Sequence, residues 1–346
     1  MSQVIYETGT VPIGDLCLEN GKTVKRAELK YEMTGRRSGP VILVCHALTG
    51  SHLSVGTEEN PGWWRGLIGP AAYINTEEYL VITFNVLGGC DGSTGPATLN
   101  PETGKPYRMT FPQLTVRDIV RAQYQALEEL GVSSLEAVIG GSLGGMQALE
   151  WGLLYPSFVK KVFLLASTPY FSDYGIAFNY IGKTAIISDP NWLDGNYEQS
   201  SDVNGLKVAR MAGMVTYRSG ELFEGRFNRS KASEEQFQVE SYLAYQGEKL
   251  AKRFDPNSYL YLMDAMNSHD IGRDRGGWRE AASEFQPELT ALGYTSDLIY
   301  APSLIKKFAD LVPESAYYEV ETLFGHDGFL TEFEKWGDLI TKHLEK

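Results

Sequence analysis

Glu136-Ala-Val-Ile-Gly140-Gly-Ser142-Leu-Gly144-Gly-Met-Gln-Ala-Leu-Glu-Trp151 joins a short apolar run to a helical one through a glycine-rich turn. Residues 136–139 have strand length, and Leu143 to Leu154 has helical periodicity and stops near Pro156. The turn contains Gly-x-Ser-x-Gly, and directly between a strand and a helix this motif predicts a nucleophile elbow, which holds the hydroxyl of Ser142 clear of a sheet. A glycine-rich turn that only packs tightly is the alternative interpretation.

Further strand-length apolar runs lie on both sides of this segment: Val41–Cys45, Tyr79–Phe84, Val162–Ala166, Leu289–Thr295 and Ser315–Val320. Such nearly continuous apolar strands are typical of a parallel sheet that is covered on both faces. A helix is predicted from Thr115 to Leu130, with Gly131 as its C-terminal stop. Alternating strands and helices indicate the α/β class.

The chain changes character after about Pro169, because strand-like runs largely vanish until about residue 290. Helical periods at Val203–Arg218, Ser233–Arg253 and Pro256–Asn267 replace them. A segment of this length is too long for a loop. We therefore predict an α/β core formed by residues 1–168 and 290–346, interrupted by a helical cap or lid at 169–289.

The two ends of the chain complete this prediction. The first 35 or so residues indicate short strands and turns, with a hairpin turn at Glu19-Asn20-Gly21-Lys22. A last amphipathic helix is predicted from about Gly328 to Leu344.

Composition and charge exclude several classes of protein. Hydrophobic residues make up 43% of the 346 residues, which excludes a disordered chain. A formal net charge of −13 makes nucleic acid and anionic membrane surfaces poor partners. The cysteines Cys17, Cys45 and Cys90 show no metal-ligand spacing, so we expect no metal site, no disulfide framework and a reducing, cytoplasmic location. The N-terminus lacks the apolar core of a signal peptide, and no apolar run has the length of a membrane span.

A nucleophilic serine needs a base and an acid, which in this arrangement follow it along the chain in the order acid, then histidine. His326 follows the final predicted strand, at the edge of the sheet where ligands bind in open α/β folds. Asp297 follows the strand Leu289–Thr295 and is the best candidate for the acid. His343 lies in the last helix and is predicted to be a surface residue. The remaining histidines are His46, His52 and His269.

Backbone N–H groups are expected to form an oxyanion hole beside Ser142. One is the N–H of Leu143, directly after the serine, and the other comes from Leu48 in the loop His46–Gly50. Because backbone donors carry this role, His46 itself is compatible with a structural role. A second glycine-rich loop, Asn85–Pro96, lacks the lysine of a phosphate-binding loop and is interpreted as an active-site wall.

Beyond these motifs, the chain resembles the homoserine O-acetyltransferases, α/β-hydrolase-fold enzymes of methionine biosynthesis. The resemblance spans nearly the whole chain and rests on these segments: Cys45–Gly50, Trp63–Pro70, Asn85–Cys90, Gly92–Pro96, Gly140–Ser142, Gly144–Trp151, Thr216–Ser219, Glu240–Leu243, Tyr245–Gly247, Arg253–Asp255, Asn257–Leu260, Ser296–Asp297 and Gly325–Asp327. Two positions depart from the family pattern: Leu143 replaces a methionine, and Tyr300-Ala301-Pro302 replaces a run of prolines.

The resemblance implies a triad of Ser142, Asp297 and His326, acetyl-CoA as co-substrate, L-homoserine as acceptor and a homodimer. It also implies that Arg210 and Asp327 bind homoserine. Homoserine is a zwitterion, so its pocket needs one cation for the carboxylate and one anion for the ammonium group. Arg218, two helical turns after Arg210, is the alternative cation.

Several alternatives remain open from the sequence. With the same triad, water as acceptor gives a serine hydrolase or esterase. A succinyl donor or a serine acceptor gives a homoserine or serine O-succinyltransferase on the same fold. A non-catalytic binding protein would be expected to lack part of the triad. The helical lid and the charged pair favour transfer, because an acyl-enzyme must be protected from water.

Overall fold

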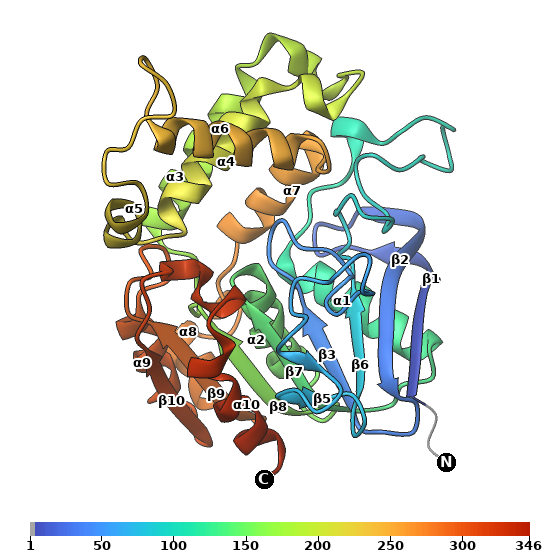
Figure 1. Ribbon diagram of the computed structural model, residues 1–346. Helices are drawn as coiled ribbons and strands as arrows, with labels where there is room; N and C mark the ends of the chain where they lie inside the picture. Colours follow the sequence, from blue (N-terminus) through green and yellow to red (C-terminus); the bar gives the residue numbers. More distant parts are fainter. Residues whose placement is uncertain (1–3) are drawn as a thin grey trace.

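The computed structural model describes residues 4–346, and an eight-stranded sheet forms its centre (Figure 1). Its strands are β1 (Val4–Cys17), β2 (Thr23–Arg36), β3 (Val41–Cys45), β6 (Leu80–Phe84), β7 (Leu135–Gly141), β8 (Val159–Leu165), β9 (Glu288–Tyr294) and β10 (Ser315–Val320), while β4 (Ile68–Gly69) and β5 (Ile74–Asn75) pair separately. The order across the sheet is β1-β2-β6-β3-β7-β8-β9-β10. β2 runs antiparallel to β1 and β6, and the other neighbours are parallel. The predicted α/β class is confirmed.

The α-helices are α1 (Val116–Glu129), α2 (Leu143–Leu154), α3 (Asp173–Ile187), α4 (Asn204–Thr216), α5 (Gly220–Phe227), α6 (Gln238–Ala251), α7 (Pro256–Asn267), α8 (Trp278–Ser283), α9 (Pro302–Ala309) and α10 (Gly337–Leu344). The predicted helix around α1 is confirmed. Thr115 caps its first turn in a reciprocal capping box with Asp118, and Gly131 follows it with φ +76°. No helix within residues 4–346 is long and apolar enough to cross a membrane.

The central parallel strands β3, β6 and β7 are buried on both faces, whereas the edge strand β10 is only partly buried. Along β3, Leu43 belongs to the apolar cluster that includes residues of α1 and α2, while Ile42 and Val44 belong to a second cluster with Trp336 and residues of α10. This two-sided burial explains the nearly continuous apolar runs, and it favours a single register for these strands.

Both ends of the chain correct the sequence-based prediction. The hairpin turn is present, but β1 and β2 are 14 residues each rather than short strands. β1 is half-exposed at the sheet edge, so it carries no apolar run that would reveal its length. The predicted helix 328–344 starts only at Gly337, because Glu332 has a positive φ of 48° and separates two short 3-10 helices, Gly325–Leu330 and Phe333–Lys335.

Five helices, α3 to α7, form a layer over the edge of the sheet at which β7 ends (Figure 1). α3 contacts α4 and α7, and α4 contacts α6. α4, α6 and α7 fall within the three predicted helical periods, whereas α3 and α5 were not predicted. Two details lie inside the predicted range 169–289 but outside this layer: α8 contacts α9, and β9 begins at Glu288.

Candidate active site

Ser142 stands between β7 and α2 in a backbone conformation that few residues other than glycine adopt. Its φ and ψ are +59° and −126°. The turn is held tightly: the Ser142 N–H donates to the carbonyl oxygen of Leu165 at 3.1 Å. A Cβ on Gly140 would lie 2.2 Å from the carbonyl oxygen of Gly144, and a Cβ on Gly144 would lie 2.0 Å from that of Cys45. Only glycine therefore fits at the positions two residues before and two residues after the serine, as the Gly-x-Ser-x-Gly motif predicted.

Asp297 and His326 come from two different strand ends and meet beside this turn. The Nδ1 of His326 lies 2.8 Å from Oδ2 of Asp297, whose side chain is completely buried. The other carboxylate oxygen, Oδ1, accepts the N–H groups of Ile299 at 2.8 Å and Tyr300 at 2.9 Å. With one oxygen fixed by two backbone donors, the other is positioned to hold the imidazole with Nδ1–H as the donor.

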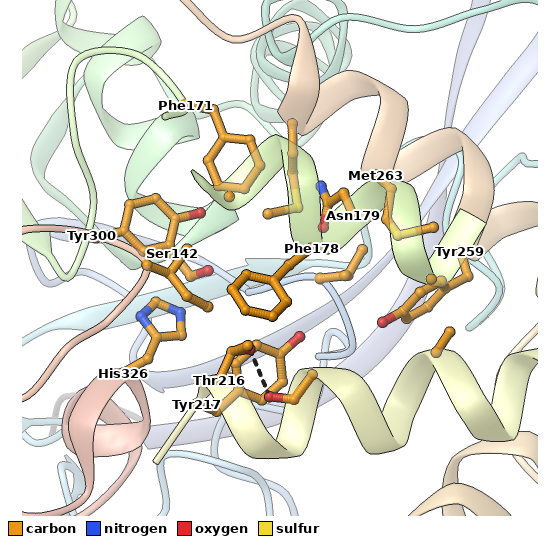
Figure 2. A pocket seen from close by; sticks show the side chains of 17 residues that line it. Ser142, Phe171, Phe178, Asn179, Thr216, Tyr217, Tyr259, Met263, Tyr300 and His326 are labelled. Atoms are coloured by element: carbon orange, nitrogen blue, oxygen red, sulfur yellow. Dashed lines mark hydrogen bonds between the residues drawn. The ribbon is translucent and has the colours of Figure 1, made fainter. Parts of the chain in front are cut away.

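Ser142 and His326 line one cavity, which lies between the strand ends and the lid (Figure 2). No hydrogen bond joins their side chains within residues 4–346. The lid supplies most of the wall, and the wall is largely apolar: Phe171, Gly175, Phe178, Asn179, Gly182, Ala209, Gly213, Thr216, Tyr217, Tyr259, Met263 and Met266. Leu48, Ile299 and Tyr300 complete it from the core. An apolar, mostly closed wall excludes water from a reacting serine.

The backbone N–H groups of Leu48 and Leu143 donate no hydrogen bond to another group in the described part of the chain. Leu143 is the first residue of α2, so its N–H is one of those that a helix leaves unpaired. Leu48 lines the cavity, and both residues are buried. Unpaired donors at this place suit an oxygen that gains negative charge, because the start of a helix favours anions.

A buried polar network holds the loop that carries Leu48. Gln147 Nε2 donates to the carbonyl oxygens of His46 at 3.1 Å and Leu143 at 3.0 Å, and its Oε1 accepts from Gln123 at 2.8 Å. One side chain thus links both segments of the expected oxyanion hole. The role of Gln147 was not predicted, because nothing in a single glutamine on a helix signals it.

His46 is a structural residue in this arrangement. Its Nδ1 lies 2.7 Å from the carbonyl oxygen of Ala47, and its Nε2 accepts the N–H of Val86 at 3.0 Å. Burial lowers the pKa of His46 to about 4, so the ring is neutral and serves as one donor and one acceptor. It ties the loop after β3 to the loop after β6.

The two predicted substrate-binding residues do not contact each other, and neither is among the described residues that line the cavity. Asp327 follows His326 in the same 3-10 helix, and its Oδ2 lies 3.1 Å from Nε of Arg218. Arg210 is half-buried on α4, and within residues 4–346 it forms no ion pair. Its guanidinium lies 5.6 Å from the ring centre of Tyr217, which lines the cavity. Of the two candidate arginines, Arg218 is therefore engaged by Asp327, whereas Arg210 forms no ion pair within residues 4–346.

Other candidates from the sequence have structural roles. The prediction that His343 lies on the surface is wrong: it is buried, and its Nε2 lies 2.9 Å from the hydroxyl of Tyr318, because α10 packs on β10 there. Burial raises the pKa of the Cys90 thiol to about 12, so it is a poor nucleophile at neutral pH. No group of three or more His, Cys, Asp or Glu side chains within residues 4–346 is arranged to hold a metal ion.

Comparisons with known proteins identify relatives that match nearly the whole of this chain. The family described as alpha/beta hydrolase fold matches residues 40–333. The homoserine O-acetyltransferase of Carboxydothermus hydrogenoformans is 40% identical over 99% of this chain and 96% of its own. That of Symbiobacterium thermophilum is 43% identical over 100% of this chain and 96% of its own.

Solved structures give the same fold. A homoserine O-acetyltransferase from Bacillus anthracis superposes with a TM-score of 0.91 at 26% identity, covering 100% of this chain and 99% of that one. One from Staphylococcus aureus gives a TM-score of 0.84 at 34% identity, covering 99% and 96%. Esterase E22 also reaches a TM-score of 0.91 at 26% identity, covering 98% and 100%. Backbone similarity alone therefore does not separate acyl transfer from ester hydrolysis.

Proposed function

Because this chain belongs to the homoserine O-acetyltransferase family, within the α/β-hydrolase fold, we propose that it transfers the acetyl group of acetyl-CoA to the hydroxyl of L-homoserine. The product is O-acetyl-L-homoserine, for methionine biosynthesis. The observation that carries the proposal is the identity of 40–43% with named homoserine O-acetyltransferases over nearly the full length of both chains. The position of Ser142 beside a fixed His326–Asp297 pair supports a covalent route.

In the first half-reaction, Ser142 Oγ attacks the thioester carbonyl of acetyl-CoA while His326 Nε2 takes its proton. The carbon–sulfur bond then breaks, and His326 returns the proton to the departing thiolate. Asp297 keeps the imidazole in the required tautomer and stabilises its cation. The N–H groups of Leu48 and Leu143 face the carbonyl oxygen as it becomes negative.

In the second half-reaction, the homoserine hydroxyl attacks the acetyl carbon of the Ser142 ester. His326 takes the hydroxyl proton and gives it to Ser142 Oγ as that oxygen leaves. The same base and the same oxyanion donors serve both steps, which is the logic of a ping-pong transferase.

Arg210 and Asp327 are our candidates for the homoserine carboxylate and ammonium group. Arg210 is chosen over Arg218 because Arg218 already pairs with Asp327. In this arrangement Arg218 orients the Asp327 carboxylate, which keeps its second oxygen for the ammonium group. Asp327 also lies next to His326 in sequence, so an ammonium group held there brings the acceptor close to the base.

Ester hydrolysis is the second candidate, and the match to esterase E22 favours it specifically. It uses the same triad, with water in place of homoserine. The two functions differ in what thiol release from acetyl-CoA requires.

Thiol release from acetyl-CoA, measured with and without homoserine, separates these functions. Sustained release only with homoserine supports transfer, and equal release without it indicates a hydrolase. Pairing acetyl-CoA or succinyl-CoA with homoserine or serine, four reactions in all, then identifies donor and acceptor. We expect turnover with acetyl-CoA and homoserine alone, and preferred use of succinyl-CoA or serine would contradict the proposal. Ser142→Ala is the negative control in each reaction.

We further propose a homodimer that forms through the lid. Large apolar side chains are exposed on three of its helices: Tyr180 and Ile181 on α3, Val208 and Val215 on α4, and Tyr245 on α6. Exposed apolar side chains gathered on one layer are typical of an interaction surface. Light scattering after gel filtration measures the mass, which is expected to be twice 38.5 kDa.

A cytoplasmic location is part of the same proposal. Cys17, Cys45 and Cys90 form no disulfide, which suits a reducing compartment. Fractionation of the native cells, followed by immunodetection of the protein, tests this location.

A further inference from the structure

Tyr300 touches the proposed triad at more than one point. Its backbone N–H donates to Oδ1 of Asp297 at 2.9 Å. Its ring stacks on the imidazole of His326, with ring centres 4.9 Å apart and planes 22° from parallel. Tyr300 and Ser142 line the same cavity, and Figure 2 shows the Tyr300 hydroxyl directed to the side of the cavity where Ser142 lies.

The hydroxyl of Tyr300 is buried and unpaired. The residue is 1% exposed, and its oxygen has no hydrogen-bond partner within residues 4–346. Most buried polar groups have a hydrogen-bond partner, because leaving one unpaired is unfavourable, so this hydroxyl needs an explanation. Burial raises the pKa of this phenol well above its usual range, while the adjacent Ser142 hydroxyl acts in the opposite direction. Tyr300 therefore keeps its proton and is available as a donor.

A second tyrosine shows what the position of Tyr300 adds. Tyr294, at the end of β9, is also buried and its hydroxyl also lacks a partner. However, Tyr294 packs against Trp336 in the core and does not line the cavity. The two residues thus share burial and an unpaired hydroxyl, and they differ in whether that hydroxyl faces the reacting oxygen.

We propose that Tyr300 is a further catalytic residue, whose hydroxyl donates a hydrogen bond to Ser142 Oγ when that oxygen carries negative charge. Its ring additionally holds the imidazole of His326 in its working orientation. The inference rests on the proposed role of Ser142 as nucleophile.

Negative charge develops on Ser142 Oγ twice in the proposed cycle. It develops when His326 removes the proton during attack on the thioester, and again when the bond from Oγ to the acetyl carbon breaks. Tyr300 keeps its proton throughout, so no additional proton acceptor is needed. Because the same oxygen is involved, the hydroxyl contributes to both half-reactions by a similar factor.

The test is Tyr300→Phe, which removes the hydroxyl and keeps the stacked ring, with Tyr294→Phe as the matched control. Rapid-mixing measurements of thiol release give the rate constant for acetylation. The rate of acetyl transfer from preformed acetyl-enzyme to homoserine gives the rate constant of the second half-reaction. A hydrogen bond to a charged oxygen contributes about 1.5–3 kcal/mol, so both constants should fall roughly 10- to 100-fold in Tyr300→Phe. Tyr294→Phe should retain wild-type constants.

Rates in Tyr300→Phe equal to those of Tyr294→Phe would overturn the proposal, as would a loss confined to one half-reaction. Tyr300→Leu tests the ring: the apparent pKa of the base in the pH profile of kcat/KM should shift in Tyr300→Leu and stay unchanged in Tyr300→Phe. An unchanged profile in Tyr300→Leu would contradict the role of the ring. Acetylation of Ser142→Ala would instead show that the nucleophile itself is misassigned, which separates failure of the proposed function from failure of this inference.

Discussion

Arg218 Nε lies 3.1 Å from Asp327 Oδ2, and this ion pair joins the end of a lid helix to the segment that carries His326. Both side chains are only partly exposed, at 19% and 15%. Of the two candidate arginines, Arg218 is therefore the one that already pairs with a carboxylate. Arg210, eight residues earlier on α4, is the other candidate arginine and forms no ion pair within residues 4–346.

Arg210→Ala should lower kcat/KM for homoserine by roughly 10²–10³-fold, because it removes a charge-assisted contact that substrate binding would bury, and breaking a buried pair costs about 3–5 kcal/mol. Acetylation of Ser142 should persist, since homoserine takes no part in it. Steady-state assays combined with the burst of thiol release measure both quantities.

Lys207→Ala is the matched control for this variant. Lys207 is a cation on the same helix, but it pairs with Glu248 and does not line the cavity. Its kinetics should match the wild type. Parallel loss of acetylation and turnover in Arg210→Ala would mean that Arg210 is structural or contacts CoA. If neither falls, Arg218 becomes the arginine to test.

Ser142→Ala should lower kcat by about 10³-fold or more, since members of a triad act as a unit. Ser142→Gly should be equally inactive but more stable than Ser142→Ala, by about 1 kcal/mol. The reason is that a residue with a Cβ is strained at φ +59° and ψ −126° and glycine is not. Urea unfolding of both variants measures the difference; a less stable glycine variant would argue against strain at the elbow.

Asp297→Asn should keep the fold and lose most of the rate, because His326 then lacks the carboxylate that fixes its tautomer. Asp310→Asn is the control: Asp310 is exposed and paired with Lys306 at the end of α9. We expect normal activity from it. If Asp297→Asn kept the wild-type rate and pH–rate profile while Asp310→Asn lost activity, Asp310 would be the acid.

His46 should make the protein less stable in acid. Burial holds its folded-state pKa at about 4, below the unfolded value near 6.5. The unfolded chain therefore binds the proton more readily, and stability falls as the pH drops from 6.5 towards 4, by about 2 kcal/mol at pH 5. Urea unfolding at pH 7 and pH 5 should show a smaller pH dependence in His46→Gln. Equal pH dependence in both proteins would rule out this contribution.

The sequence predicted those parts of the fold that short-range patterns encode. The buried strands β3, β6 and β7 appear as apolar runs because both of their faces are covered. The helix α1 is recognisable from its N-terminal cap, its apolar stripe and the glycine that follows it. The sequence-based prediction failed where an element is buried on one face only or is held mainly by tertiary contacts. β1 alternates at an exposed edge, and α3 buries little of its length although it forms part of the lid.

The candidate site divides in the same way. Ser142 was predictable because an elbow needs a motif, and Asp297 and His326 because they follow strands in a fixed order. Tyr300 was visible only as a departure from a family pattern. Its importance depends on a stacked contact and an unpaired hydroxyl, and neither is encoded in neighbouring residues.

β8 and β9 pair side by side although β8 ends at Leu165 and β9 starts at Glu288, so the whole lid is made on the ribosome between two adjacent strands. A contact at such sequence distance forms late, because the entropy of closing the intervening loop opposes it until other contacts exist. A nascent chain thus carries Ser142 long before it carries Asp297 and His326. With the triad that we propose, the site is complete only after β9 and β10 have both docked, so the growing chain is not expected to consume acetyl-CoA before it is nearly complete.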